Sequence, residues 1–216
     1  MREEIIAAAQ VLAAEGLVTA FGHASARRGQ DGFLITPPKP LGSLQPNEPL
    51  LEVPLDESEL PAGVPGEAWI HWALYKTHPG VEAICRAQPT ISTALASAGV
   101  PIRPLHGQGA FLGKEVPIFD DARLIRNRES GEVLARRLGR AKAVVLRGNG
   151  ALTVGKSIGA AVARMWVLEV SAELNRIAAA VGNPQVLSPE EFSYWESVGD
   201  ELLERIWSYL KTDRRG

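Results

Sequence analysis

Hydrophobic positions along the chain follow two periods in alternation, which predicts helices separated by short strands. Residues 2–15 carry apolar side chains at helical spacing, and Gly16 follows them as a residue typical of helix ends. The longest stretch of this kind covers residues 158–181. Further predicted helices are 67–76, 89–99 and 188–210, and the predicted strands are 24–28, 33–36, 50–55, 81–87, 144–147 and 151–154.

Local signals predict where loops lie and where helices begin. The prolines of residues 36–49 remove backbone donors, which predicts an irregular loop. Residues 188–191 (SPEE) have the pattern of a capping box with proline at the first helical position. Residues 119–123 (FDDAR) are expected to open a helix that their two aspartates cap. The tail, residues 211–216, is expected to be frayed.

Charge and cysteine content narrow the classes of partner and compartment. The 23 Lys and Arg residues against 25 Asp and Glu leave a net charge of −2, which does not indicate a nucleic-acid or membrane partner. The single cysteine, Cys85, cannot form an internal disulfide, so a reducing cytoplasm is the expected location. The first helix lacks the features of a targeting peptide, and no apolar run reaches the roughly 18 residues of a membrane span.

Several short motifs follow one another in an order that is characteristic as a set. They are residues 22–27 (GHASAR) with 33–37 (FLITP), 67–75 (EAWIHWALY), 84–89 (ICRAQP) and 146–150 (LRGNG). In this order, and with the long helix after the last, the chain resembles the class II aldolase/adducin family over about residues 5–180. The resemblance implies a single α/β domain over 1–216, with a core of about 3–182 and a C-terminal helix over 188–211. It also implies a three-layer α/β/α sandwich around a largely antiparallel sheet, and a homotetramer with active sites between subunits.

The family's metal-binding positions are occupied here by residues that do not suit zinc. In the aldolases three histidines bind the metal and a glutamate transfers protons; the corresponding residues are Arg86, Gln88 and Asn149, with the glutamate retained as Glu67. Arginine has no lone pair to give. Its charge about 4 Å from a dication would cost roughly 8 kcal/mol at an effective dielectric of 20. No cofactor is therefore expected, with a hard divalent ion held by Glu67 and the amides as the alternative.

The pattern that binds phosphate in sugar-phosphate aldolases is also replaced. His23 stands where those enzymes have an asparagine, and Pro65 and Gly66 stand where they have two serines. A phosphorylated sugar is therefore not the expected substrate.

The remaining polar residues suggest a site for a small carboxylate. We expect Glu67, Arg86 and Asn149 to be catalytic and to face one pocket with Gln88, where they could grip a carboxylate. The other expected substrate-binding residues are His23, His71 and His106, the last in a glycine-rich loop. Glu67, His71 and Tyr75 share one helical face, so simple packing of that helix is the alternative for the two aromatic residues.

Three functions are compatible with these residues. The first is a metal-independent lyase, a decarboxylase or retro-aldol enzyme for a small hydroxylated carboxylate; relatives of the family in aromatic-acid degradation, such as dihydroxyphthalate decarboxylases, carry this domain. The second is a metal-dependent aldolase or epimerase whose ligands include His23, His71 or His106. The third is a non-catalytic module of the adducin kind.

Overall fold

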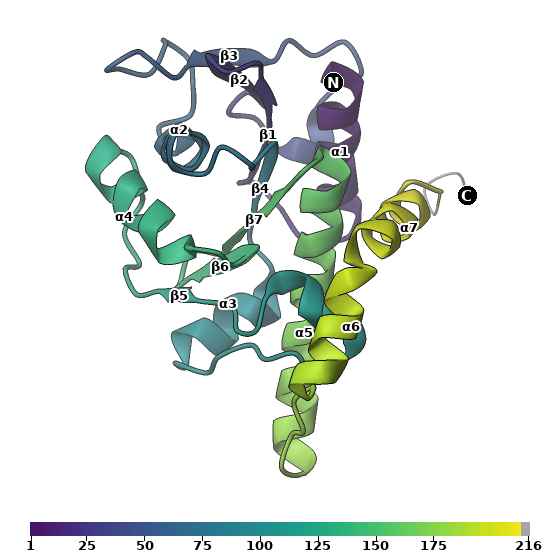
Figure 1. Ribbon diagram of the computed structural model, residues 1–216. Helices are drawn as coiled ribbons and strands as arrows, with labels where there is room; N and C mark the ends of the chain where they lie inside the picture. Colours follow the sequence, from purple (N-terminus) through teal and green to yellow (C-terminus); the bar gives the residue numbers. More distant parts are fainter. Residues whose placement is uncertain (213–216) are drawn as a thin grey trace.

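A sheet of seven strands forms the middle layer of the protein, and helices cover both of its faces (Figure 1). The computed structural model describes residues 1–212. Of the tail expected to be frayed, residues 211 and 212 instead complete the last helix, and the part from residue 213 onward lies outside the described residues. The strands are β1 (His23–Arg28), β2 (Gly32–Ile35), β3 (Leu51–Pro54), β4 (Ala83–Ala87), β5 (Ile118–Phe119), β6 (Ala143–Leu146) and β7 (Ala151–Gly155). The helices are α1 (Arg2–Ala14), α2 (Ala68–Thr77), α3 (Thr90–Ser97), α4 (Arg128–Leu138), α5 (Ile158–Val181), α6 (Pro189–Ser197) and α7 (Gly199–Thr212), with the short 3-10 helices η1 (Leu41–Ser43) and η2 (Gly107–Leu112).

The strand order is β3-β2-β1-β4-β7-β6-β5, with β4 near the middle. All neighbouring pairs are antiparallel except β5 and β6, which are parallel. The predicted three-layer fold around a largely antiparallel sheet is therefore confirmed. The six predicted strands and the helix over 158–181 are present, with shifts of one or two residues at most ends of the strands.

Two hydrophobic cores lie on opposite faces of the sheet. The first packs α1, α5 and α7 against one face, and the second packs α2 and α4 against the other. Along β4, Ala83, Cys85 and Ala87 point into the first core, whereas Ile84 points into the second. Because side chains alternate along a strand, Arg86 lies on the same face as Ile84, toward α2. This alternation places the only charged residue of β4 against the helix that follows Glu67.

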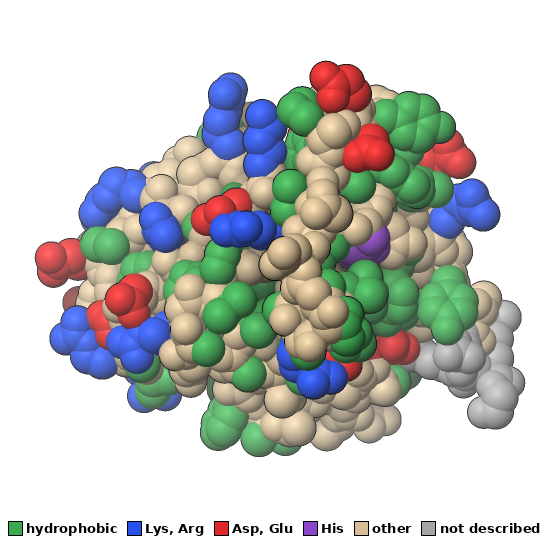
Figure 2. All heavy atoms as spheres, turned by 90° about the horizontal axis from the view of Figure 1, so that it is seen from below, with side chains coloured by type: hydrophobic (Ala, Val, Ile, Leu, Met, Phe, Trp, Pro, Cys, Tyr) green, Lys and Arg blue, Asp and Glu red, His purple; other side chains and the backbone are tan. Residues whose placement is uncertain are grey.

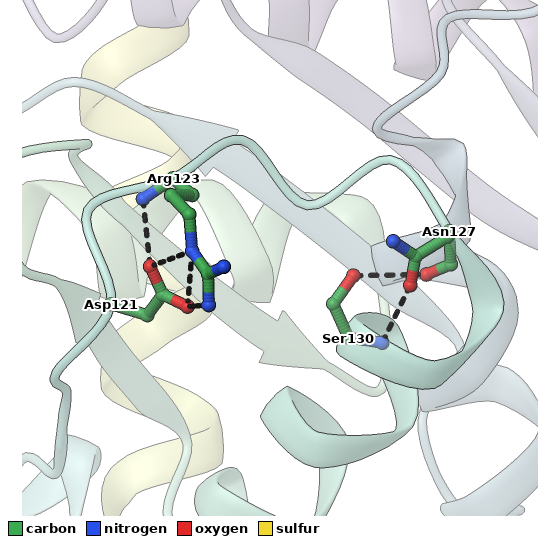
Figure 3. Close-up of polar contacts among 4 residues, drawn as sticks. All are labelled: Asp121, Arg123, Asn127 and Ser130. Carbon is green, nitrogen blue, oxygen red and sulfur yellow. Dashed lines mark hydrogen bonds and ion pairs between the residues drawn. The ribbon is translucent and has the colours of Figure 1, made fainter.

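The helix expected to open at residue 119 begins later, at Arg128, and its cap is Asn127. Figure 3 shows the Asn127 side chain accepting a hydrogen bond from the Ser130 amide, at 2.9 Å. The aspartates expected to cap the helix lie in the loop before it. Asp121 instead forms an ion pair with Arg123, with 2.6 Å between Oδ2 and Nη2 (Figure 3). The expectation was wrong because both aspartates pair with arginines instead, Asp120 with Arg147 and Asp121 with Arg123.

The C-terminal segment forms two helices, not the single helix predicted over 188–210. The predicted capping box at Ser188 and Glu191 is present at the start of α6. The chain then leaves helical hydrogen bonding at Val198, and α7 begins at Gly199. An added Cβ at Gly199 would lie 3.1 Å from the Phe111 ring, so this glycine allows close contact with η2. Tertiary packing thus coincides with a break that local sequence signals do not mark.

The outer surface mixes charged and apolar side chains. Figure 2 views the molecule from below and shows Lys and Arg side chains gathered toward the side of α4, with hydrophobic side chains scattered between the charges. On α5, the large apolar residues Leu174, Ile177 and Val181 are exposed near its C-terminal end. Among residues 1–212, no helix has the length and apolar character needed to span a bilayer.

Candidate active site

Arg86 lies near the end of β4 and is almost fully buried, with 1% of its surface exposed. Its Nη2 donates hydrogen bonds to Asn149 Oδ1 at 2.7 Å and to the Asn149 carbonyl at 3.2 Å. The same nitrogen lies 3.2 Å from Glu67 Oε1. Nη2 of Arg86 therefore contacts both Asn149, at another of the family's metal-ligand positions, and Glu67, the family's glutamate.

Two backbone features bring Glu67 and Asn149 to this arginine. Glu67 occupies the residue before α2, where a helix start favours negative charge. Asn149 lies in a tight turn between Gly148 and Gly150, whose φ angles are +68° and +84°. An added Cβ at Gly150 would lie 2.1 Å from the Ala87 carbonyl oxygen. Only glycine, which has no Cβ, allows the backbone of the turn to pack this closely against the end of β4.

His23 and His71 lie beside the arginine on the same face of the sheet. His23 is the direct cross-strand partner of Arg86, and the His23 and His71 ring centroids are 5.9 Å apart. Behind them, Ser25 Oγ lies 2.7 Å from His71 Nδ1 and 2.8 Å from the Tyr75 hydroxyl. Ser25 lies in the first motif, but its role is not evident from the sequence. The contact at Nδ1 holds the His71 ring, and its Nε2 has no hydrogen-bond partner among the described residues.

The charge at this site is carried by Arg86 and Glu67. Burial lowers the pKa of His23 to about 3, and the nearby Arg86 acts in the same direction. Burial, then His23 and Arg86, hold the pKa of His71 well below its usual range. Burial also lowers the pKa of Arg86 while Glu67 raises it, and arginine remains protonated at any pH at which proteins fold. Two neutral imidazoles therefore flank one ion pair.

Unpaired polar atoms gather at this point of the structure. Six buried side-chain nitrogen or oxygen atoms lack a hydrogen-bond partner among the described residues, and five of them belong to His23, Glu67, His71 and Arg86. Glu67 Oε1 is among them, because its contact with Arg86 lacks hydrogen-bond geometry. Each such atom costs about 1–3 kcal/mol. Native proteins carry few of them, and a cluster indicates a site with a function beyond packing.

Gln88 and His106 do not make described hydrogen bonds to this group. The backbone N–H of Gln88 donates to the Leu17 carbonyl at 2.9 Å. Gln88 directly follows β4 and is half-buried. His106 Nε2 lies 2.9 Å from Ser171 Oγ on α5. The structure therefore joins Glu67, Arg86, Asn149, His23 and His71, and it leaves the predicted roles of Gln88 and His106 as predictions.

The pocket expected in front of Glu67 and Arg86 is not among the four described cavities. These cavities are lined by other residues. Glu67 and Asn149 contact Nη2, and the guanidinium is buried. The shared pocket of Glu67 and Arg86 stays a prediction.

The donor set does not fit the zinc ion that the fold family implies. At the position of one ligand, Arg86 brings a positive charge and hydrogen-bond donors only. The Asn149 Oδ1 that could have served as a second ligand accepts a hydrogen bond from this arginine. No group of three or more His, Cys, Asp or Glu residues within 1–212 has the spacing to hold a metal.

Acid is expected to weaken the fold through His23. Unfolding brings this histidine from a pKa of about 3 back to its ordinary 6.5, so the unfolded chain binds the extra proton between these values. The contribution of His23 to the free energy of unfolding is therefore fully present above pH 6.5. Below that pH the free energy of unfolding falls by about 1.4 kcal/mol per pH unit because of this residue. Urea unfolding between about pH 4 and 7 measures the slope. His23→Asn should flatten it by about one proton; an unchanged slope would show that His23 titrates normally in the folded protein.

Comparison with known proteins agrees with the fold and the motif order. The model of the family described as "Class II Aldolase and Adducin N-terminal domain" matches residues 3–175. The 3,4-dihydroxyphthalate decarboxylase of Terrabacter sp. (strain DBF63) is 29% identical over 88% of this chain and 86% of that protein. The protein of the same name from Arthrobacter keyseri is 30% identical over 84% and 79%. The structure of l-fuculose-1-phosphate aldolase from Thermus thermophilus is 33% identical with a TM-score of 0.72, over 85% of this chain and 100% of that one.

Proposed function

The chain belongs to the class II aldolase and adducin family, and from this premise we propose that it is a lyase that decarboxylates a small hydroxylated aromatic acid. The observation that carries the proposal is the cluster of unpaired polar atoms around the Arg86–Glu67 ion pair. Relatives that match most of the chain are named as decarboxylases of a dihydroxyphthalate, which supplies the substrate class.

In the proposed reaction the aromatic ring itself serves as the electron sink. Glu67, once the substrate has displaced it from Arg86, takes up a proton from solvent and donates it to the ring carbon that bears the carboxylate. The ring hydroxyl supports the resulting positive charge by ketonisation. The bond to the carboxylate then breaks, its electron pair restores the aromatic ring, and carbon dioxide leaves. One proton is consumed, which Glu67 regains from solvent. Proton transfer of this kind contributes about 10²–10⁴-fold in rate.

Arg86 is proposed to hold a carboxylate that remains on the substrate or the oxygen that gains charge. A guanidinium that gripped the departing carboxylate would stabilise the ground state and slow the reaction. A dicarboxylate such as a phthalate avoids this difficulty, because one group is bound while the other leaves. The incoming acid takes the place of Glu67 beside the guanidinium and frees that carboxyl for proton transfer. Asn149 keeps its hold on Nη2 and fixes the orientation of the guanidinium.

We propose that this chemistry proceeds without zinc. Arg86 occupies the position of one of the family's metal ligands, and its buried positive charge supplies the electrostatic stabilisation. A protonated Glu67 supplies the acid. Ring ketonisation replaces the enediolate for which the aldolases need a Lewis acid.

A direct assay of carbon dioxide release tests the proposed function. The purified chain is incubated with 3,4-dihydroxyphthalate, and the gas and the dihydroxybenzoate product are quantified. Phthalate without ring hydroxyls is the matched control, because it cannot ketonise and should not react. Turnover of l-fuculose-1-phosphate in place of the aromatic acid would instead identify a retro-aldol enzyme, and no turnover of either would favour a non-catalytic module.

We also propose that the active form is a homotetramer, as the family resemblance implies. Exposed Leu174, Ile177 and Val181 near the end of α5 provide apolar surface for contact between copies. Light scattering at micromolar concentration is expected to give the mass of four chains. A mass of one chain with full turnover would show that each site is complete within one subunit.

A further inference from the structure

A charged cavity lies at the ends of β4 and β7 that are farther from the candidate active site. It has a volume of about 320 Å³ and is lined by the segment before β4, the end of β7 and the junction of α6 with α7. Arg86 and Asn149 lie at the opposite ends of the same two strands, β4 and β7. Five residues of strand separate the two sites by roughly 16 Å. Nothing in the proposed decarboxylation uses this cavity.

Arg164 is the buried charge at this cavity, with 8% of its surface exposed. Its Nε donates to the Phe111 carbonyl at 3.0 Å and its Nη1 to the Val154 carbonyl at 2.9 Å. No carboxylate among residues 1–212 lies within 4.0 Å of the guanidinium, and its Nη2 donates no hydrogen bond to them. Carbonyl dipoles satisfy two donors but do not neutralise a charge, and a buried charge is costly unless it is paired. Burial lowers the pKa of Arg164, and Asp200 raises it from beyond 4.0 Å. The guanidinium therefore has a more distant carboxylate but no contacting one, and an anion in the cavity would be its contacting counter-ion.

The side chains at the mouth add further positive charge. Arg140, Lys142 and Lys156 also line the cavity, and the acidic residues there are Glu196 and Asp200. Four cations against two carboxylates leave a surplus of two positive charges. Asp200 is already engaged with Lys156, at 2.7 Å, and both of these side chains are largely exposed. Partial burial first, and then Arg164 and Lys156, lower the pKa of Lys142, whereas Glu196 and Asp200 raise it.

The segment that leads into α5 also lies at this cavity. Gly155 and Lys156 line the cavity and immediately precede Ser157, which caps this helix of 24 residues. The N-terminus of a helix attracts anions through its backbone dipoles. The buried guanidinium, the lysines and the two residues before the helix cap thus line one cavity.

We propose that this cavity binds the phosphate group of a small molecule. A phosphate carries about two negative charges near neutral pH, which matches the surplus of the cavity, and arginine and lysine donors suit its oxygens. The volume admits free phosphate or a small phosphate ester. The site is distinct from the former sugar-phosphate pattern of the family, which lies at His23, Pro65 and Gly66.

Calorimetric titration of the full chain with sodium phosphate and with glycerol 3-phosphate tests the proposal. One site per chain is expected, and Lys142→Gln should weaken binding about fivefold. Asp200→Asn should tighten it several-fold, because the substitution removes a competing negative charge. Arg164→Lys should weaken it further, but its two carbonyl contacts also support the fold, so Lys142→Gln and Asp200→Asn carry the test.

Controls separate this site from general surface charge and from the proposed active site. Lys39→Gln, in the proline-rich loop, removes the same charge elsewhere and should leave the affinity unchanged. The Arg86→Met, Glu67→Gln double variant should also bind phosphate normally, whatever the outcome of the decarboxylase assay. Binding of the ester alone would identify a phosphate ester as the ligand, and binding of both probes would show that the phosphate group suffices. The proposal would be overturned if neither probe bound at millimolar concentration. It would also be overturned if Lys142→Gln and Asp200→Asn both bound phosphate with the affinity of the original chain.

Discussion

Glu67→Gln is expected to lower the turnover number by about 10²–10⁴-fold while substrate binding persists. Glutamine has nearly the same shape as glutamate but cannot deliver or accept a proton at neutral pH. Glu67 Oε1 contacts Arg86 without hydrogen-bond geometry, so the substitution costs little of the hydrogen bonding that holds the site together. Removal of the negative charge beside Arg86 also favours an acidic ligand. The affinity for the substrate should therefore be equal or higher.

Steady-state kinetics and calorimetric binding of 3,4-dihydroxyphthalate measure the two effects separately. Glu82→Gln is the matched control, because Glu82 is an exposed glutamate near the start of β4 with only a long contact to Arg27. That variant should keep full activity. Turnover of Glu67→Gln within a factor of about three of the original would remove Glu67 from the role of proton donor.

Arg86→Met is expected to abolish the binding of acidic ligands and to destabilise the fold. Methionine keeps the apolar bulk of the side chain but leaves the Glu67 carboxylate without its partner. Breaking a buried ion pair in this way costs about 3–5 kcal/mol. The double variant Arg86→Met, Glu67→Gln removes both charges and should recover most of that stability without recovering binding.

Urea unfolding and calorimetry on the two variants distinguish a binding role from a structural one. Arg147→Met provides the control, because Arg147 is a more exposed arginine in the same turn region, paired with Asp120. It should bind the acid normally. If the stable double variant binds 3,4-dihydroxyphthalate as tightly as the original chain, Arg86 is not the carboxylate-binding residue.

Much of the fold could be predicted because local patterns and tertiary structure agree. The helix over Ile158–Val181 was predicted with its observed bounds, since its long apolar period and the capping Ser157 both mark it. The start of helix α4 was predicted too early, because the aspartates of the preceding loop resemble a cap more closely than Asn127 does. The break at Val198 was missed because it lies where Gly199 contacts Phe111, which is distant in the sequence.

The candidate site was predictable where helical spacing or motif order determines it. The spacing of Glu67 and His71 places them on one face of the helix, and the family order brings Arg86 to Asn149. Ser25 could not be assigned, because its partners His71 and Tyr75 lie 46 and 50 residues away. Sequence patterns also do not reveal which buried atoms lack partners, and these atoms are the feature that marks the site. The substrate-binding role of His106, whose Nε2 lies 2.9 Å from Ser171 Oγ, stays a prediction.

Metal content and turnover measured on one sample test the central claim, decarboxylation at the Arg86–Glu67 pair without zinc, most directly. The chain is dialysed against a chelator, its zinc is quantified by elemental analysis, and carbon dioxide release from 3,4-dihydroxyphthalate is measured on the same preparation. We expect zinc far below one atom per chain together with undiminished turnover, because a guanidinium and two amides cannot replace three imidazoles. About one zinc per chain, whose removal abolishes turnover and whose return restores it, would contradict the claim.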